Sequence, residues 1–118
     1  MEKTALMVWG GWDGHTPHEC VLLFAPRLEA RGYRVEISDS LDAYLDRERM
    51  QHLDLIVQCV TMVTITPEQE KALLQAVAGG VGFAGWHGGV LDAFRENVDF
   101  QWMIGGQWVA HPLSLIHI

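Results

Sequence analysis

The chain alternates between short apolar runs and segments in which apolar residues recur at helical spacing. The runs have the length and composition of strands, and they lie at residues 5–9, 33–37, 53–60 and 81–85. Helical patterns separate them, at residues 17–31, 41–49 and 67–78. Strands that alternate with helices form a parallel sheet with right-handed crossovers and helices on both faces. The pattern therefore predicts an α/β fold, with the short alternating run at 33–37 nearest a sheet edge.

Two of the helices begin with the same signal. A threonine and a proline, at residues 16–17 and 66–67, supply an N-cap and a first helical position. Glu19 and Gln69 stand three positions after each threonine, so we expect a capping box at both helices. The buried stripe of the first helix is expected to contain Val21, Leu22, Phe24, Ala25 and Leu28, with Gly32 ending the helix. Beyond the last strand, helical patterns recur at 90–95 and 99–104, and residues 107–112 have an extended pattern.

Composition narrows the class of protein. The chain has 118 residues, 49% of them hydrophobic, which is enough for one domain with a buried core. A formal charge of -7, from 15 acidic and 8 basic residues, argues against a nucleic-acid surface, because phosphate binding needs clustered Lys and Arg. No apolar run reaches membrane-spanning length, and residues 1–4 lead into a strand rather than a secretory signal. We therefore expect a cytoplasmic protein without nucleic-acid or membrane partners.

The two cysteines, Cys20 and Cys59, are too few for a disulfide scaffold and lack the paired spacing of a zinc or redox motif. Free cysteines are among the most buried residues in proteins. We expect both to be small core residues.

Polar side chains follow three of the predicted strands. The groups are Asp13, His15, His18 and Glu19 after the first strand, Thr61, Thr64 and Thr66 after the third, and His87 after the fourth. Because the carboxyl ends of parallel strands meet at one edge of a sheet, ligands collect there. The sequence thus predicts a site at this edge.

His87 lies where the fourth strand turns sharply into a helical pattern, flanked by glycines. In hydrolases and amidotransferases built this way, the raised residue is Ser or Cys. Strained turns tend to mark functional sites, which favours a ligand-contacting or acid/base imidazole. The alternative is a half-buried histidine that bonds a backbone group and fixes the turn.

Signals for a cofactor are weak. The loop at residues 10–15 is glycine-rich but has neither the dinucleotide fingerprint nor a Walker lysine. Four histidines raise the question of a metal, namely His15, His18, His87 and His111. His15 and His18 lie across a loop-to-helix boundary, unlike a zincin pair, so hydrogen-bonded histidines are the favoured interpretation and a metal stays an alternative. The cofactor is left unassigned.

Five tryptophans offer aromatic surface. Aromatic rings beside polar groups form the floors of carbohydrate sites, and Trp12 and Trp86 lie on the loops of the predicted site. They are the candidates for stacking on a ligand. Trp102 and Trp108 are expected to be packing residues.

Three motifs together resemble the ThuA-like family, the trehalose-utilisation proteins. They are Gly10-Gly11 with His15 and His18-Glu19, residues 80–87, and residues 105–108 with His111-Pro112. The resemblance implies a class I glutamine amidotransferase-like fold, which is a flavodoxin-like three-layer α/β/α sandwich. It also implies a role in the use of trehalose or related disaccharides in bacteria.

This resemblance leads to a functional hypothesis in which the ligand is a sugar. The catalytic candidates are His87, His18 and Glu19, and the substrate-binding candidates are Trp12, Asp13, His15, Trp86 and His111. Glutamine amidotransferases have Cys where this chain has His87, and their chemistry needs a thiolate. We therefore expect no glutaminase activity. The alternatives are a non-catalytic sugar-binding or interaction domain and a metal-dependent hydrolase.

ThuA-like domains continue beyond the His-Pro pair that matches His111-Pro112. We therefore expect residues 1–112 to be the N-terminal part of such a domain, truncated at its C-terminal end, and residues 113–118 to be a tail outside the family pattern. Part of the sheet's cover would then be missing. Apolar surface near residues 102–118 would be exposed or used in association, for example in a homo-oligomer.

Overall fold

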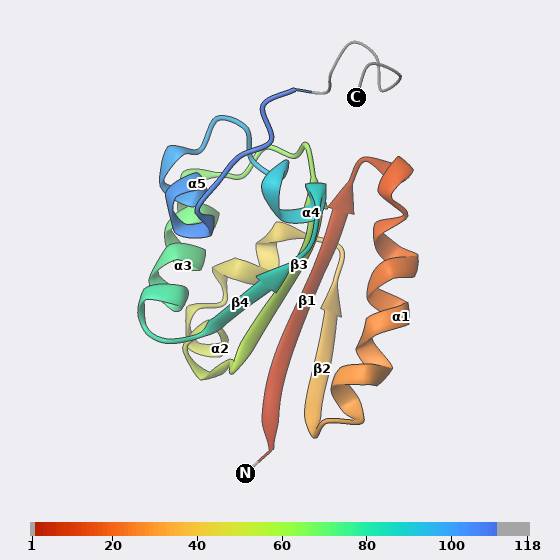
Figure 1. Cartoon of the computed structure of the whole chain (residues 1–118). Helices are drawn as coiled ribbons and strands as arrows, with labels where there is room; N and C mark the ends of the chain where they lie inside the picture. Colours follow the sequence, from red (N-terminus) through yellow and green to blue (C-terminus); the bar gives the residue numbers. More distant parts are fainter. Residues whose placement is uncertain (1, 111–118) are drawn as a thin grey trace.

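A computed structural model describes residues 2–110 of the chain and shows a four-stranded parallel sheet (Figure 1). Its strands are β1 (Lys3–Gly11), β2 (Tyr33–Ser38), β3 (Leu55–Thr61) and β4 (Gly82–Gly85). Their order in the sheet is β2-β1-β3-β4, so β1 and β3 are central and β2 and β4 form the edges. The α/β alternation and the edge position of β2 are confirmed.

Helices cover both faces of the sheet (Figure 1). One face is covered by α1 (Pro17–Glu29). The other carries η2 (Leu41–Leu45), α2 (Arg47–His52), α3 (Pro67–Ala78) and α5 (Val98–Ile104). Successive strand residues point to opposite faces, so Met7 and Val57 pack toward α1 while Leu6 and Ile56 pack toward α3. The three-layer α/β/α sandwich is the predicted fold class.

The two predicted capping boxes have different outcomes. At α3, the Gln69 N–H donates to Thr66 Oγ1 (3.2 Å) and the Thr66 N–H donates to Gln69 Oε1 (2.9 Å), so this box is confirmed. At α1 the prediction is wrong, because Thr16 has left-handed backbone angles (φ 46°, ψ 52°) and makes no side-chain cap. Its N–H closes the preceding turn η1 (Asp13–His15) by donating to the Asp13 carbonyl (2.9 Å). That turn fixes the backbone of Thr16, and its hydroxyl contacts Cys20 Sγ (3.8 Å) instead of capping a backbone N–H.

Two further helix predictions need correction. Leu22 and Phe24 of α1 are 51% and 37% exposed, because only the side that carries Val21 and Ala25 meets the sheet. The helical segment expected at residues 41–49 is divided into η2 and α2. Asp46 separates them, since its Oδ1 caps α2 by accepting from the Arg49 N–H (3.0 Å).

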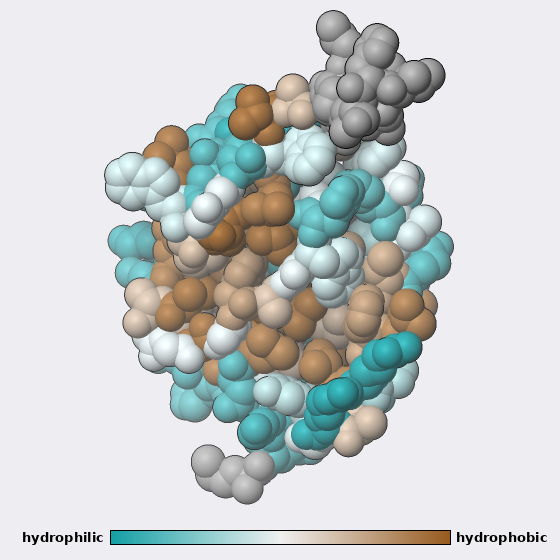
Figure 2. All heavy atoms as spheres, viewed as in Figure 1, coloured by the Kyte–Doolittle hydropathy of each residue, from teal (hydrophilic) through white to brown (hydrophobic). Residues whose placement is uncertain are grey.

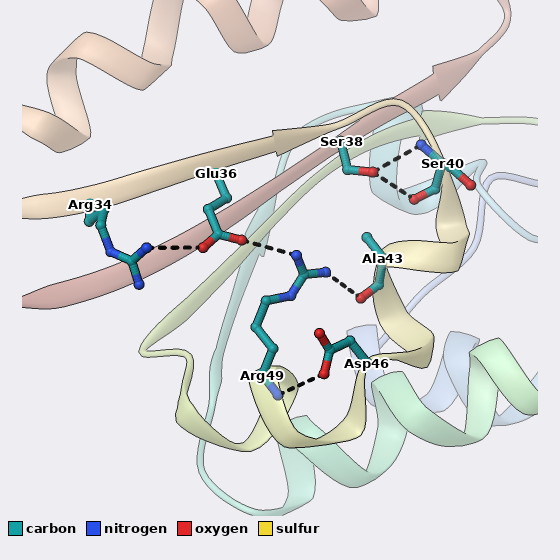
Figure 3. A network of polar contacts seen from close by, with 7 residues as sticks. All are labelled: Arg34, Glu36, Ser38, Ser40, Ala43, Asp46 and Arg49. Atoms are coloured by element: carbon teal, nitrogen blue, oxygen red, sulfur yellow. Dashed lines mark hydrogen bonds and ion pairs between the residues drawn. The ribbon is translucent and has the colours of Figure 1, made fainter.

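A polar network fastens η2 and α2 to the edge strand β2 (Figure 3). Glu36 of β2 pairs with Arg34 (3.3 Å) and with Arg49 of α2 (3.0 Å). Arg49 also donates to the Ala43 carbonyl in η2 (2.7 Å). These side chains are partly exposed, so each ion pair contributes at most about 1 kcal/mol. The network therefore holds η2 and α2 in place beside β2 but adds little to the free energy of unfolding.

Gln58 is a buried polar residue whose side chain bonds to two other segments of the chain. It is fully buried in β3, and its Oε1 accepts a hydrogen bond from the Tyr44 hydroxyl (2.9 Å). Its Nε2 donates to the Gly89 carbonyl (3.2 Å) at the start of α4 (Gly88–Leu91). One side chain thus joins η2, the central sheet and the short helix after β4.

Within residues 2–110, no helix has both the length and the apolar character needed to cross a membrane.

Replacing Tyr44 by Phe is expected to lower the free energy of unfolding by about 1–3 kcal/mol, because the buried Oε1 of Gln58 loses its donor. Urea denaturation measures the change. Tyr33→Phe is the matched control, since Tyr33 is only half-buried on the edge strand. Equal losses in the two variants would contradict the importance assigned to the Tyr44–Gln58 bond.

Candidate functional site

The carboxyl ends of β1, β3 and β4 lie together at one end of the sheet (Figure 1). A small cavity of about 20 Å³ opens at this end. Its lining comes from the segments that follow the three strands, and consists of Trp12, His15, Met62, His87, Gly88, Asp92 and Trp108. Three predicted site residues therefore meet here, namely Trp12, His15 and His87.

His87 forms the turn between β4 and α4 and has strained backbone angles (φ 50°, ψ −141°). Glycine is the residue that adopts such angles readily, and a residue with a Cβ needs support from its surroundings. Support comes from close packing of α4 on the sheet, since a Cβ on Gly89 would lie 2.9 Å from Cys59 Cα. The Gln58–Gly89 hydrogen bond holds the same turn, and the exposed His87 side chain is left on the sheet rim.

His15 is the neighbour of His87. The two ring centroids are 4.8 Å apart with planes at 70°. A hydrogen bond of 2.8 Å between His15 Nδ1 and Thr61 Oγ1 orients the His15 ring from the end of β3. Trp12 lies edge-on to His15 at 4.8 Å, and Trp108 lies 5.8 Å from His87. The two imidazoles are thus bordered by indole rings.

Asp92 is a site residue that sequence reasoning missed. Its side chain is buried. Arg95 donates to it twice, from Nε to Oδ1 (2.5 Å) and from Nη2 to Oδ2 (2.9 Å). The hydrogen bonds and charge of Asp92 raise the pKa of Arg95. His15 Cε1 and Asp92 Cβ lie 2.5 and 3.5 Å from the point where a Gly88 Cβ would be. The one signal in the sequence is an acid in the apolar segment that follows His87.

Met62 also lies at the cavity and was not predicted. It has left-handed backbone geometry (φ 54°), and its N–H donates to the Asp92 carbonyl (2.7 Å). This bond connects the segment after β3 to the end of α4. Met62 therefore helps to hold Asp92 in place.

Other predicted site residues lie away from the cavity. Asp13 and Glu19 are exposed, in η1 and in the first turn of α1. His18 stacks on Trp9 at 4.4 Å. Trp86 packs against Phe24 of α1 at 4.9 Å, on the face of the sheet that α1 covers. His111 lies outside the described residues.

The remaining tryptophans differ from the expectation that both are packing residues. Trp108 lines the cavity, and its backbone N–H donates to the Leu91 carbonyl (2.8 Å), which brings the returning chain over α4. Trp102 is 79% exposed, because α5 turns that side of its surface away from the sheet. The packing prediction for Trp102 is wrong.

Both cysteines are free thiols. Cys59 is buried, as predicted, whereas Cys20 is only partly buried. Burial, with a smaller contribution from Cys20, raises the pKa of the Cys59 thiol to about 11. Cys59 is therefore protonated at neutral pH.

For the metal alternative, residues 2–110 contain no group of three or more His, Cys, Asp or Glu side chains placed to hold an ion.

Comparison with known proteins places this arrangement in a family. The family model described as "ThuA: Trehalose utilisation" matches residues 4–117. The chain belongs to the ThuA family. The match continues beyond Pro112.

A solved ThuA-like structure shows the same fold. It is the crystal structure of a ThuA-like protein from Bacteroides uniformis ATCC 8492, with a TM-score of 0.72 and 18% sequence identity. The alignment covers 88% of this chain but 44% of that one, so this chain spans less than half of the length of its ThuA-like neighbour. No curated protein matches the sequence.

The strain at His87 predicts an unusual order of stability between two variants. We expect His87→Gly to be more stable to unfolding than His87→Ala by about 1 kcal/mol, because only glycine adopts the observed angles without strain. Gln75 on α3 provides the matched control, since it is exposed in a helix interior. There glycine should be the less stable of the two by about 1 kcal/mol. The same order at both positions would contradict the strained turn.

Proposed function

We propose that this ThuA chain binds trehalose or a related disaccharide at the carboxyl end of its sheet, with His87 as the acid/base group. The observation that carries the proposal is the juxtaposition of His87 and His15 on the sheet rim, 4.8 Å apart. A strained backbone is retained where the surroundings hold a side chain in position, and His87 is held in this way. Imidazole exchanges protons near neutral pH, which suits it to sugar hydroxyl chemistry.

In this proposal, each residue around His87 has its own role in binding the sugar. His15 is oriented by Thr61 and provides a second ring nitrogen at the same ligand atom or its neighbour. The indole rings of Trp12 and Trp108 offer apolar faces to the C–H side of a sugar ring. Asp92 contributes to the cavity lining, and its pairing with Arg95 balances the charge of its carboxylate. The geometry favours His87 and His15 over His18 and Glu19 for contact with the reacting atoms.

The cavity size limits how a disaccharide would sit. A volume of about 20 Å³ accommodates a single hydroxyl or a water molecule rather than a whole sugar ring. The ligand would therefore insert one polar group between the imidazoles and lie across the exposed rim. Trp12, which lines the cavity and is 52% exposed, is the proposed residue for that contact.

Thiol chemistry of the amidotransferase kind has no support at this site. The turn carries an imidazole where a thiolate would be needed, and Cys59 lies under α4 with its pKa raised to about 11. A group protonated at neutral pH and shielded by the helix makes a poor nucleophile. The proposal therefore includes no glutaminase activity.

His87→Gln is expected to lower turnover of the sugar substrate by about 10²–10⁴-fold, the usual contribution of one acid/base group. Calorimetric titration with trehalose and related disaccharides, run beside a product assay, measures binding and turnover separately. The control is His52→Gln, which changes an exposed histidine at the end of α2. Full activity of His87→Gln would refute the role of His87. Sugar binding without turnover by the native chain would instead establish the non-catalytic sugar-binding alternative.

Cysteine labelling tests the exclusion of thiol chemistry. In a Cys20→Ser variant, the thiolate of Cys59 should increase about tenfold per pH unit and level off near pH 11, so iodoacetamide labelling should be very slow at pH 7. Mass spectrometry measures the extent of labelling, with the urea-unfolded variant as the control for intrinsic reactivity. Rapid labelling of the folded protein at pH 7, or release of ammonia from glutamine, would contradict the exclusion.

A further inference from the structure

Helix α1 is apolar around most of its circumference. Residues 21–26 are six consecutive apolar residues, so they cover every side of the helix. Val21 and Ala25 are buried against the sheet, whereas Leu22 and Leu23 are 51% and 58% exposed. A helix that covers one face of a soluble domain normally carries polar residues on its outer side. The outer side of α1 has the composition of a contact surface.

The apolar surface continues from α1 onto the sheet. α1 covers β1 and β2 and reaches β3, but it leaves β4 uncovered (Figure 1). A groove of about 400 Å³ lies along this side of the helix, and its apolar lining includes Phe24, Leu28, Leu55, Val57, Ala84 and Trp86. Figure 2 shows apolar surface gathered in the middle of the view, between α1 on the right and α3 on the left. Arg27 and Arg31 of α1 supply the charge at the groove.

Charged residues on α1 are placed for pairing with a second α1. Glu19, Leu23 and Arg27 are four residues apart, form one line along the helix, and are all exposed. Where two α1 helices run antiparallel with Leu23 opposite Leu23, each Glu19 lies opposite the other helix's Arg27. A parallel pair would instead place Glu19 opposite Glu19 and Arg27 opposite Arg27. The pattern is therefore self-complementary in the antiparallel arrangement alone.

We propose that two copies of this chain associate through α1, antiparallel, about a two-fold axis at Leu23. A two-fold contact uses the same patch on both subunits, as the symmetric spacing of Glu19 and Arg27 requires. The formal charge of -7 repels one copy from another in general. The local charge pattern offsets that repulsion at this surface and fixes the direction of the helices. The partner helix then covers Leu23, with Leu22 on one side of the contact and Phe24 on the other.

Charge reversal tests the arrangement by sedimentation equilibrium of the whole chain over a range of concentrations. Glu19→Arg places four positive charges at the contact, and Arg27→Glu places four negative ones. Each single variant should raise the dimer dissociation constant about tenfold or more, since two attractive pairs become repulsive. The double variant Glu19→Arg/Arg27→Glu should dimerise like the native chain. An equimolar mixture of the two single variants should form a heterodimer.

The matched controls change charge by the same amount on the opposite side of the sheet. Glu68→Arg on α3 and Arg47→Glu on α2 are exposed and should leave the dissociation constant within about twofold of the native value. A native chain that stays monomeric at every concentration would overturn the proposal, and so would equal behaviour of the α1 variants and the controls. A dimer that Glu19→Arg and Arg27→Glu leave intact, but that Leu23→Ser disrupts, would overturn the antiparallel charge pairing.

Discussion

The hydrogen bonds of Gln58 are the constraint on which both fold and site depend. A buried amide is costly unless its donor and acceptor are used, and Gln58 uses both, toward Tyr44 and toward the Gly89 carbonyl. Side chains on this face of β3 otherwise build the apolar core under α3. The bond to the Gly89 carbonyl fixes α4 against the sheet, and the bond from Tyr44 orients the amide that makes it. The strained turn at His87 begins that helix, so the polar interaction in the core positions the group on the rim.

A parallel strand that is buried on both faces must be apolar along its whole length. This pattern is visible in the few residues of the strand itself, so the sequence predicts the sheet well. The Thr66 capping box is likewise formed by neighbours in sequence. Thr16 differs because the turn η1 decides its backbone angles before the helix begins. The exposure of Leu22 and Phe24 could not be predicted either, because it depends on how far α1 extends across a sheet whose strand order the chain does not reveal.

At the candidate site, too, features that depend on neighbours in sequence could be predicted and features that depend on tertiary contacts could not. His87, His15 and Trp12 could be grouped from sequence, since each follows a strand and the carboxyl ends of parallel strands converge. Asp92 and Trp108 could not, because α4 is a single turn and the chain returns over it after α5. Their positions follow from tertiary hydrogen bonds, Met62 to Asp92 and Trp108 to Leu91, that have no local sequence pattern.

The central position of β1 has a consequence for the order in which the molecule folds. β1 comes first in the chain, and its Ala5 pairs with Val35 on one side and with Leu55 on the other. The β1–β2 unit closes the shorter loop, β3 closes a longer one, and within residues 2–110 β4 pairs only with β3. The cavity at His87 is lined by residues that follow β1, β3 and β4, so it needs the pairing of both β3 and β4. A partly folded chain can therefore hold most of its sheet and still lack the pocket.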